Sequence, residues 1–171
     1  KKLDINLRQK YIGLFPGSRK QEIEKILPIM SDTLELLNKN HHECLGIVGC
    51  APGADLDSYM RLGGKKLRYV SALTYDLMTH SEMNLVASGT ATLECAILGR
   101  PLFILYKTSF ITYIVARSLI KIPYVGLVNV VAGEKIIPEF IQSDCRPDKI
   151  FTELNKYFSD PGSQELMKER L

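Results

Sequence analysis

Paired cysteines are missing from this sequence of 171 residues. No two cysteines stand at the CxxC spacing of zinc and redox motifs, and the histidines are not spaced with them as zinc ligands. The residues concerned are Cys44, Cys50, Cys95, Cys145, His41, His42 and His80. We therefore expect buried free thiols in a reducing compartment and no metal site.

Long apolar runs and a strong excess of one charge are also missing. No stretch reaches the ~18 consecutive apolar residues that a membrane-spanning helix requires. The basic start of the chain is not followed by the apolar run of a secretory signal. The net charge of +3 is too small to indicate nucleic-acid binding. Together these absences predict a cytoplasmic protein with no nucleic-acid partner.

The composition is that of a globular protein. Apolar residues make up 46% and charged residues 24% of the chain, which excludes a disordered linker, an acidic tail and a collagen. The length predicts a single domain over residues 1–171. Because residue 1 is lysine instead of methionine, we expect the chain to be a piece of a longer protein.

Short apolar runs alternate with longer helical patterns along the chain. Strands are predicted over residues 11–15, 44–48, 67–70, 84–87 and 101–106. Helices are predicted over residues 22–38, 54–62, 75–81, 90–98, 109–122, 147–158 and 164–170. Since the strands are continuously apolar, we expect an α/β fold with a parallel sheet and helices on both faces. Such a sheet binds ligands at the carboxyl ends of its strands.

The first candidate loop, Pro16-Gly17-Ser18-Arg19, follows the first strand. Gly17 lets the backbone approach a ligand closely, and Ser18 offers a hydroxyl that could cap the next helix. Arg19 presents a fork of donors suited to phosphate oxygens, and the N–H groups of the helix start attract the same anion. A plain helix start with a solvated arginine fits these residues equally well.

The second candidate loop, Ser88-Gly89-Thr90, leads from another strand into a helix. Glu94 follows Thr90 on the same helix face, about 6 Å further along the axis. That is roughly the separation of a diphosphate from the ribose of the same nucleotide, and a carboxylate accepts hydrogen bonds from ribose hydroxyls. The alternative is an ordinary helix start whose dipole favours Glu94.

A third candidate loop is predicted over residues 128–133, followed by a polar segment at 138–142. Asn129 and Gln142 carry amides that could recognise a base or sugar hydroxyls. Taken alone, both residues fit a turn or the protein surface better.

Two segments closely resemble the C-terminal half of the lipid-A-disaccharide synthase family. They are residues 13–23 (GLFPGSRKQEI) and residues 86–142, where SGTATLE, GRP, YK, ARSLIK and PYVGL follow in the family's order and spacing. The similarity extends from about Tyr11 to Asp160 and is least specific over residues 41–69.

The resemblance implies a Rossmann-like domain of a GT-B glycosyltransferase, with the N-terminal acceptor domain absent from this chain. The implied enzyme is inverting and uses no metal or other cofactor. It moves 2,3-diacylglucosamine from UDP-2,3-diacylglucosamine to 2,3-diacylglucosamine 1-phosphate (lipid X), giving UDP and a β-1,6-linked disaccharide phosphate for lipid A biosynthesis. The isolated chain is expected to bind nucleotide without catalysis, and the resemblance is compatible with a homodimer.

The resemblance also implies roles for the candidate residues. Arg19 would be catalytic, because an arginine beside the departing diphosphate stabilises charge that grows in the transition state. Glu94 would hold the ribose, Asn129 would lie near the donor, and Gln142 is a weaker candidate. The residues implied at the diphosphate are Gly17, Ser18, Arg19, Ser88, Gly89 and Thr90.

The helix predicted over residues 109–122 is apolar with a basic edge. Such a helix fits the core or an anionic membrane surface, and acylated substrates favour the membrane. We therefore expect peripheral attachment to the inner face of the cytoplasmic membrane. The candidate membrane contacts are Phe110, Ile114, Arg117 and Lys121.

Two other functions are compatible with the sequence. One is another GT-B UDP-sugar enzyme, of the lipid II glycosyltransferase or UDP-N-acetylglucosamine 2-epimerase type. Both enzyme types share a glutamate that follows a helix start of small residues. They lack the sequence run from YK (residues 106–107) to AG (residues 132–133). The other is a stand-alone, non-catalytic nucleotide-binding module. Flavodoxin-like signalling would require an acidic cluster at the strand ends, which the sequence lacks.

Overall fold

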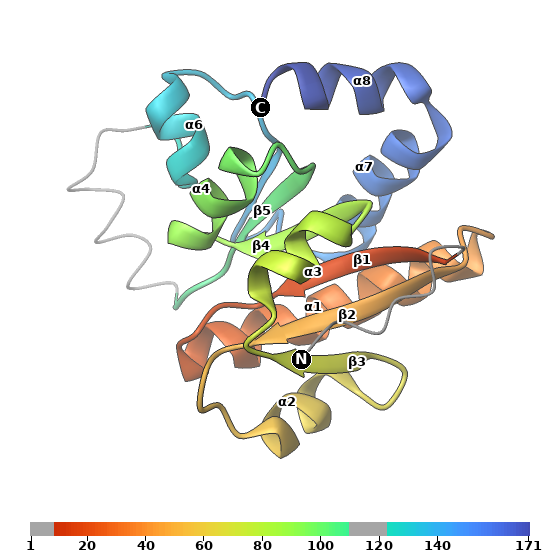
Figure 1. Ribbon diagram of the computed structural model, residues 1–171, viewed down its shortest axis with the longest axis vertical. Coiled ribbons are helices and arrows are strands. Elements are labelled where there is room, and N and C mark those ends of the chain that lie inside the picture. Colours follow the sequence, from red (N-terminus) through yellow and green to blue (C-terminus); the bar gives the residue numbers. More distant parts are fainter. Residues whose placement is uncertain (1–8, 110–122) are drawn as a thin grey trace.

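A six-stranded parallel sheet forms the centre of the computed structural model, which describes residues 9–109 and 123–171 (Figure 1). The strand order is β3-β2-β1-β4-β5-β6, and every neighbouring pair is parallel. The strands are β1 (Lys10–Phe15), β2 (Cys44–Cys50), β3 (Arg68–Ser71), β4 (Met83–Ala87), β5 (Leu102–Tyr106) and β6 (Glu139–Ile141).

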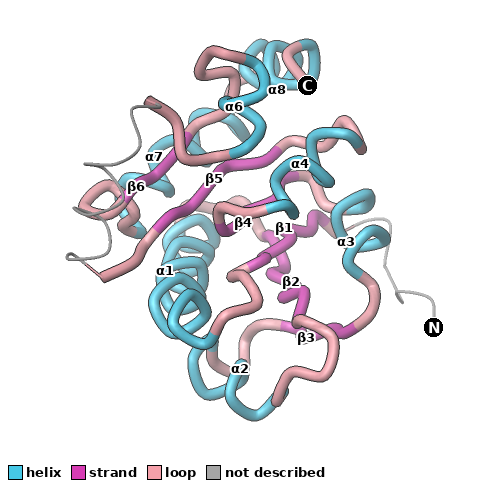
Figure 2. The backbone as a smooth tube through the Cα atoms, turned by 90° about the vertical axis from the view of Figure 1, so that its left-hand side faces the viewer, coloured by secondary structure: helices cyan, strands magenta, loops and turns pink. Residues whose placement is uncertain are grey.

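Helices cover both faces of the sheet, as the sequence predicts (Figures 1 and 2). One face carries α1 (Lys20–Lys39), α2 (Leu56–Gly63) and α7 (Pro147–Ser159). The other carries α3 (Thr74–His80), α4 (Thr90–Ile97) and α6 (Leu127–Ala132). The last helix, α8 (Pro161–Glu169), packs against α7.

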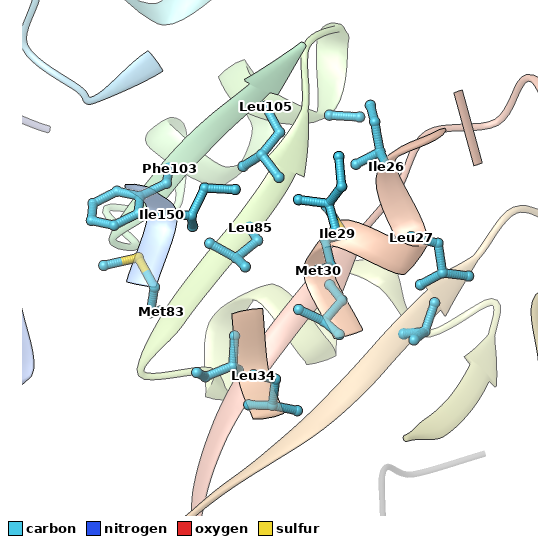
Figure 3. Packing of buried hydrophobic residues seen from close by; sticks show 14 of the residues in the cluster. Ile26, Leu27, Ile29, Met30, Leu34, Met83, Leu85, Phe103, Leu105 and Ile150 are labelled. Carbon is cyan, nitrogen blue, oxygen red and sulfur yellow. The ribbon is translucent and has the colours of Figure 1, made fainter. Parts of the chain in front are cut away.

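The central strands are buried on both faces, which is why they are almost wholly apolar. Every residue of β4 is buried, and so are all residues of β1 after its first. Figure 3 shows Leu85 of β4 between side chains of α1 and Ile150 of α7, with Phe103 of β5 beside Ile150. Truncating a fully buried side chain such as Met30 to alanine typically costs about 2–5 kcal/mol of unfolding free energy.

Most predicted elements are confirmed, with ends that differ by at most three residues. The third candidate loop is wrong, because Leu127–Ala132 forms the short helix α6, ended by Gly133 with a left-handed φ of 73°. The strand β6 has only three residues, and the sequence did not predict it. All but the first residue of the helix predicted over residues 109–122 lies outside the described residues, including Phe110, Ile114, Arg117 and Lys121.

The strand order reverses direction between β1 and β4. From β1 the chain builds outward through β2 to β3, then crosses back to β4 and builds the other way through β5 to β6. The loops that leave β1 and β4 therefore diverge to opposite faces of the sheet, toward α1 and α4 (Figure 2). In open parallel sheets this divergence leaves a crevice at the carboxyl edge, where ligands bind.

A buried asparagine joins α6 to β6. Asn129 is fully buried, and its side chain makes four hydrogen bonds. Its Nδ2 donates to the Ile137 carbonyl at 2.8 Å and to Glu139 Oε1 at 2.9 Å. Its Oδ1 accepts from the N–H groups of Ile136 at 3.0 Å and Ile137 at 2.9 Å. The amide thus supplies hydrogen-bond partners to backbone groups of residues 136 and 137, which lie outside any helix or strand just before β6.

Replacing Asn129 by alanine should lower the free energy of unfolding by about 3 kcal/mol, because buried polar groups would lose their partners. Urea denaturation followed by circular dichroism measures the change. The matched control is Asn40→Ala, an exposed asparagine whose amide makes one hydrogen bond, to the Leu36 carbonyl. Equal stability of the two variants would contradict the structural role of Asn129.

Candidate functional site

A hollow of about 560 Å³ opens at the carboxyl edge of the sheet, where the strand order reverses. Its walls come from the ends of β1, β2 and β4 and from the first turns of α1 and α4. Seven of the nine residues predicted to bind the donor line it together. They are Gly17, Ser18, Arg19, Ser88, Gly89, Thr90 and Glu94.

The loop after β1 depends on a glycine. Gly17 has a φ of +100°, which residues other than glycine rarely adopt. A Cβ at this position would also lie 2.5 Å from Glu22 Oε2. The turn brings α1 to its start with Arg19 as the N-cap residue. Ser18 therefore does not cap the helix as expected, and no side chain does.

The loop after β4 has a similar design. Gly89 is the N-cap residue of α4, again without a side-chain cap, and its carbonyl accepts a hydrogen bond from Thr92 Oγ1 at 2.7 Å. The Ser88 hydroxyl donates to the Val125 carbonyl at 2.9 Å, which ties this loop to the segment before α6. Thr90 is exposed at the first position of the helix.

Two helix N-termini that lack a capping side chain thus meet at one hollow. Among the described residues α3, α6 and α7 also lack a side-chain cap, whereas α2 and α8 begin with Asp55 and Asp160, whose carboxylates accept hydrogen bonds from N–H groups of the first turn. N–H groups without such a partner, together with the helix dipole, favour an anion. An anion bound between α1 and α4 would accept hydrogen bonds from the N–H groups of these helix starts, as Asp55 and Asp160 do at α2 and α8.

Glu94 supplies a carboxylate to the same hollow. The residue is half-buried one turn into α4, and no partner for its carboxylate is found in residues 9–109 and 123–171. A half-buried carboxylate without a partner costs free energy, because water solvates it only in part. Hydroxyl groups of a ligand would satisfy it.

Arg19 supplies a cation. Its side chain is 83% exposed, and its Nη1 lies 3.1 Å from Glu22 Oε1. Exposed pairs of this kind contribute little to stability. Arg19 therefore loses little free energy when it leaves Glu22 and pairs with a phosphate instead. The guanidinium can therefore turn to a ligand in the hollow without disturbing the fold.

Asn129 and Gln142, the other two predicted ligands, do not line the hollow. Asn129 is enclosed between α6 and β6. Gln142 follows β6 with a φ of 49°, and its Oε1 accepts from the Thr108 N–H at 3.2 Å, while its buried Nε2 has no partner among residues 9–109 and 123–171. Both residues support backbone near the site, and a direct role for either stays a prediction.

Sequence reasoning missed the wall contributed by β2 and α3. This wall includes Gly49, Cys50, Ala51, Pro52 and Thr74. Burial raises the pKa of the Cys50 thiol to about 11, so it forms a neutral surface. The signal was present in the sequence, because the carboxyl end of a strand next to the reversal point must border the crevice.

The histidines offer no general base to the hollow. His42 Nε2 lies 2.9 Å from Asn155 Oδ1 and its ring packs on Phe158, while His80 Nδ1 bonds the Asp76 carbonyl at 2.7 Å. All four cysteines are buried free thiols, as predicted.

Neither a metal-ligand cluster nor a membrane-spanning helix is found in the described residues. Within residues 9–109 and 123–171, no three metal-ligating side chains cluster. No helix in the same two ranges is long and apolar enough to cross a bilayer.

The family model for lipid-A-disaccharide synthetase matches residues 1–170. The lipid-A-disaccharide synthase of Persephonella marina is 34% identical in an alignment of 178 positions that covers 99% of this chain and 47% of that protein. The enzyme of that name from Geobacter sulfurreducens is 34% identical in an alignment of 173 positions that covers 95% of this chain and 45% of that protein. The chain therefore spans about half the length of these curated relatives, and it matches their C-terminal part.

A solved structure shares the fold. The UDP-GlcNAc 2-epimerase from Neisseria meningitidis, bound to UDP-GlcNAc, superposes with a TM-score of 0.60 at 16% identity, covering 95% of this chain and 39% of that one. At this identity the likeness shows the fold alone, the Rossmann-like α/β fold found in GT-B glycosyltransferases. Since the family model covers all but one of the 171 residues, the chain belongs to the lipid-A-disaccharide synthase family.

Proposed function

We propose that this chain is the donor-binding domain of a lipid-A-disaccharide synthase and holds the UDP of the sugar donor. The observation that carries the proposal is the hollow itself. Two helix starts, an exposed arginine and the Glu94 carboxylate converge on it, and among residues 9–109 and 123–171 no side chain caps these helices or pairs with that carboxylate. A nucleoside diphosphate has the complementary groups: phosphate oxygens for the N–H groups and Arg19, and ribose hydroxyls for Glu94.

The donor is UDP-2,3-diacylglucosamine and the acceptor is 2,3-diacylglucosamine 1-phosphate. An acceptor hydroxyl attacks the anomeric carbon as the bond to the diphosphate breaks, with inversion to a β-1,6 linkage. Negative charge grows on the departing β-phosphate. Helix-start N–H groups and Arg19 stabilise that charge more in the transition state than in the ground state, which accelerates transfer.

The general base of the reaction is proposed to lie in the part of the protein outside this chain. The curated relatives are about twice as long as the chain, and none of the three histidines lines the hollow. We assign the general base and the acceptor hydroxyl to the other half of the enzyme. Residues 1–171 then bind nucleotide without transferring sugar.

Calorimetric titration of the full-length protein tests the donor assignment. UDP should bind in preference to ADP and GDP, and Glu94→Gln should weaken UDP binding about tenfold, because hydrogen bonds to a charged group contribute roughly 1.5–3 kcal/mol.

The matched control is Glu24→Gln, which removes an exposed carboxylate of α1 that pairs with Lys20 at 3.8 Å, outside the hollow. It should leave UDP binding unchanged. Absence of binding to all three nucleotides would refute the donor-domain proposal.

Arg19→Ala should lower kcat about 100-fold, the usual effect of removing one donor that stabilises transition-state charge. Steady-state assays with saturating donor and acceptor measure it. Arg61→Ala is the control, because Arg61 is an exposed arginine of α2 beside Asp55, outside the hollow. Normal turnover of Arg19→Ala would show that Arg19 has no catalytic role.

The protein is also proposed to attach to the inner face of the cytoplasmic membrane, from which acyl chains must be drawn. Two exposed apolar side chains support an apolar face near the site: Ile97 is 83% exposed on α4 and Val131 is 75% exposed on α6. These helices pack against each other. In the sequence, the basic and apolar residues 110–122 precede α6.

Co-sedimentation with anionic liposomes tests this attachment. The wild-type protein should pellet, and Phe110→Asp combined with Ile114→Asp should reduce the pelleted fraction, because carboxylates oppose both burial and the anionic surface. Tyr75→Asp, at an exposed position of α3, should pellet normally. Unchanged pelleting of the double variant would count against these contacts.

A further inference from the structure

A second cavity, of about 340 Å³, adjoins the hollow on the side of β5. The two share Arg19, Glu22, Ala87 and Ser88. From this shared wall the hollow extends toward β2, and the second cavity extends between the first turns of α1 and the residues at the end of β5. A molecule bound across the carboxyl edge of the sheet would therefore pass from one to the other.

Four cations line this second cavity, and two of them have carboxylate neighbours. Arg19 pairs with Glu22 at 3.1 Å, and Lys20 with Glu24 at 3.8 Å. The other two, Lys25 of α1 and Lys107 after β5, are half-buried. Over residues 9–109 and 123–171, neither has a carboxylate within ion-pairing distance. Two half-buried ammonium groups facing one cavity attract an anion.

The position of Lys107 is fixed by the backbone around it. Its Nζ donates to the Cys145 carbonyl at 3.1 Å. On either side, the Gln142 N–H donates to the Tyr106 carbonyl at 2.8 Å and the Thr108 N–H donates to Gln142 Oε1 at 3.2 Å. Because a lysine ammonium has three N–H donors and the Cys145 carbonyl accepts from one of them, the other N–H groups remain available to a ligand. Such pre-organisation lowers the cost of binding.

We propose that Lys25 and Lys107 bind the phosphate monoester of the acceptor sugar. The inference rests on the proposed function, in which helix starts and Arg19 already neutralise the donor diphosphate. The remaining anion of the reaction is the acceptor phosphate, whose charge of about −2 at neutral pH matches two ammonium groups. Lysine binds phosphate as a point charge, without the bidentate geometry of arginine.

The experiment compares two acceptors in the full-length enzyme: 2,3-diacylglucosamine 1-phosphate and the same sugar without phosphate. Lys25→Met and Lys107→Met should each lower kcat/KM for the phosphorylated acceptor about tenfold, as loss of a charge-assisted hydrogen bond does. The same variants should leave kcat/KM for the phosphate-free acceptor and the affinity for UDP unchanged. Lys25→Arg and Lys107→Arg should recover much of the loss by restoring the charge.

Lys39→Met is the control, because Lys39 lies at the far end of α1 and pairs with Glu35. It should behave as wild type with both acceptors. An equal loss with both acceptors would overturn the proposal in favour of a structural role, and a loss of UDP affinity would assign the lysines to the donor. If the wild-type enzyme transfers sugar and binds UDP but accepts both sugars equally, only this inference fails. Absence of UDP binding would overturn the proposed function as well.

Discussion

The burial of β1 and β4 on both faces is the constraint on which the site depends. Strands of this kind need helices above and below, and right-handed crossovers then make them parallel. The crossover from β3 to β4 places β4 beside β1 and reverses the strand order. The loops that follow these two adjacent strands therefore diverge there. The hollow is therefore a product of packing, and the polar residues in it occupy space that the apolar core leaves open.

Local sequence was sufficient to predict the residues of the site that lie in contiguous loops. Gly17 to Arg19 and Ser88 to Glu94 each combine a strand end, a small residue and a helix start, so their proximity follows from one topological rule. The same loops resemble a known family, and the comparisons confirm that family. The fold was predictable for the same reason, since long apolar strands and amphipathic helices carry their own periodicity.

What the sequence could not predict depends on partners brought together by the fold. The resemblance implies that Asn129 lies near the donor, and the sequence could not predict that its amide makes four hydrogen bonds that join two segments within the chain. The sequence could not single out Lys107, because its half-buried environment and the lack of a carboxylate beside it among the described residues depend on the folded structure. The strand β6 was missed because three residues at a sheet edge carry too little pattern to recognise.

The hydrogen bond from Ser88 to the Val125 carbonyl has a mechanical consequence. Glu139 of β6 holds the other side of the same segment, with its carboxylate accepting from the N–H groups of Val125 at 3.0 Å and Gly126 at 2.8 Å. The loop after β4 is thus tied to the outermost strand of the sheet through the peptide between Val125 and Gly126. A change at that outer strand, which does not line the hollow, would loosen a loop that borders the hollow.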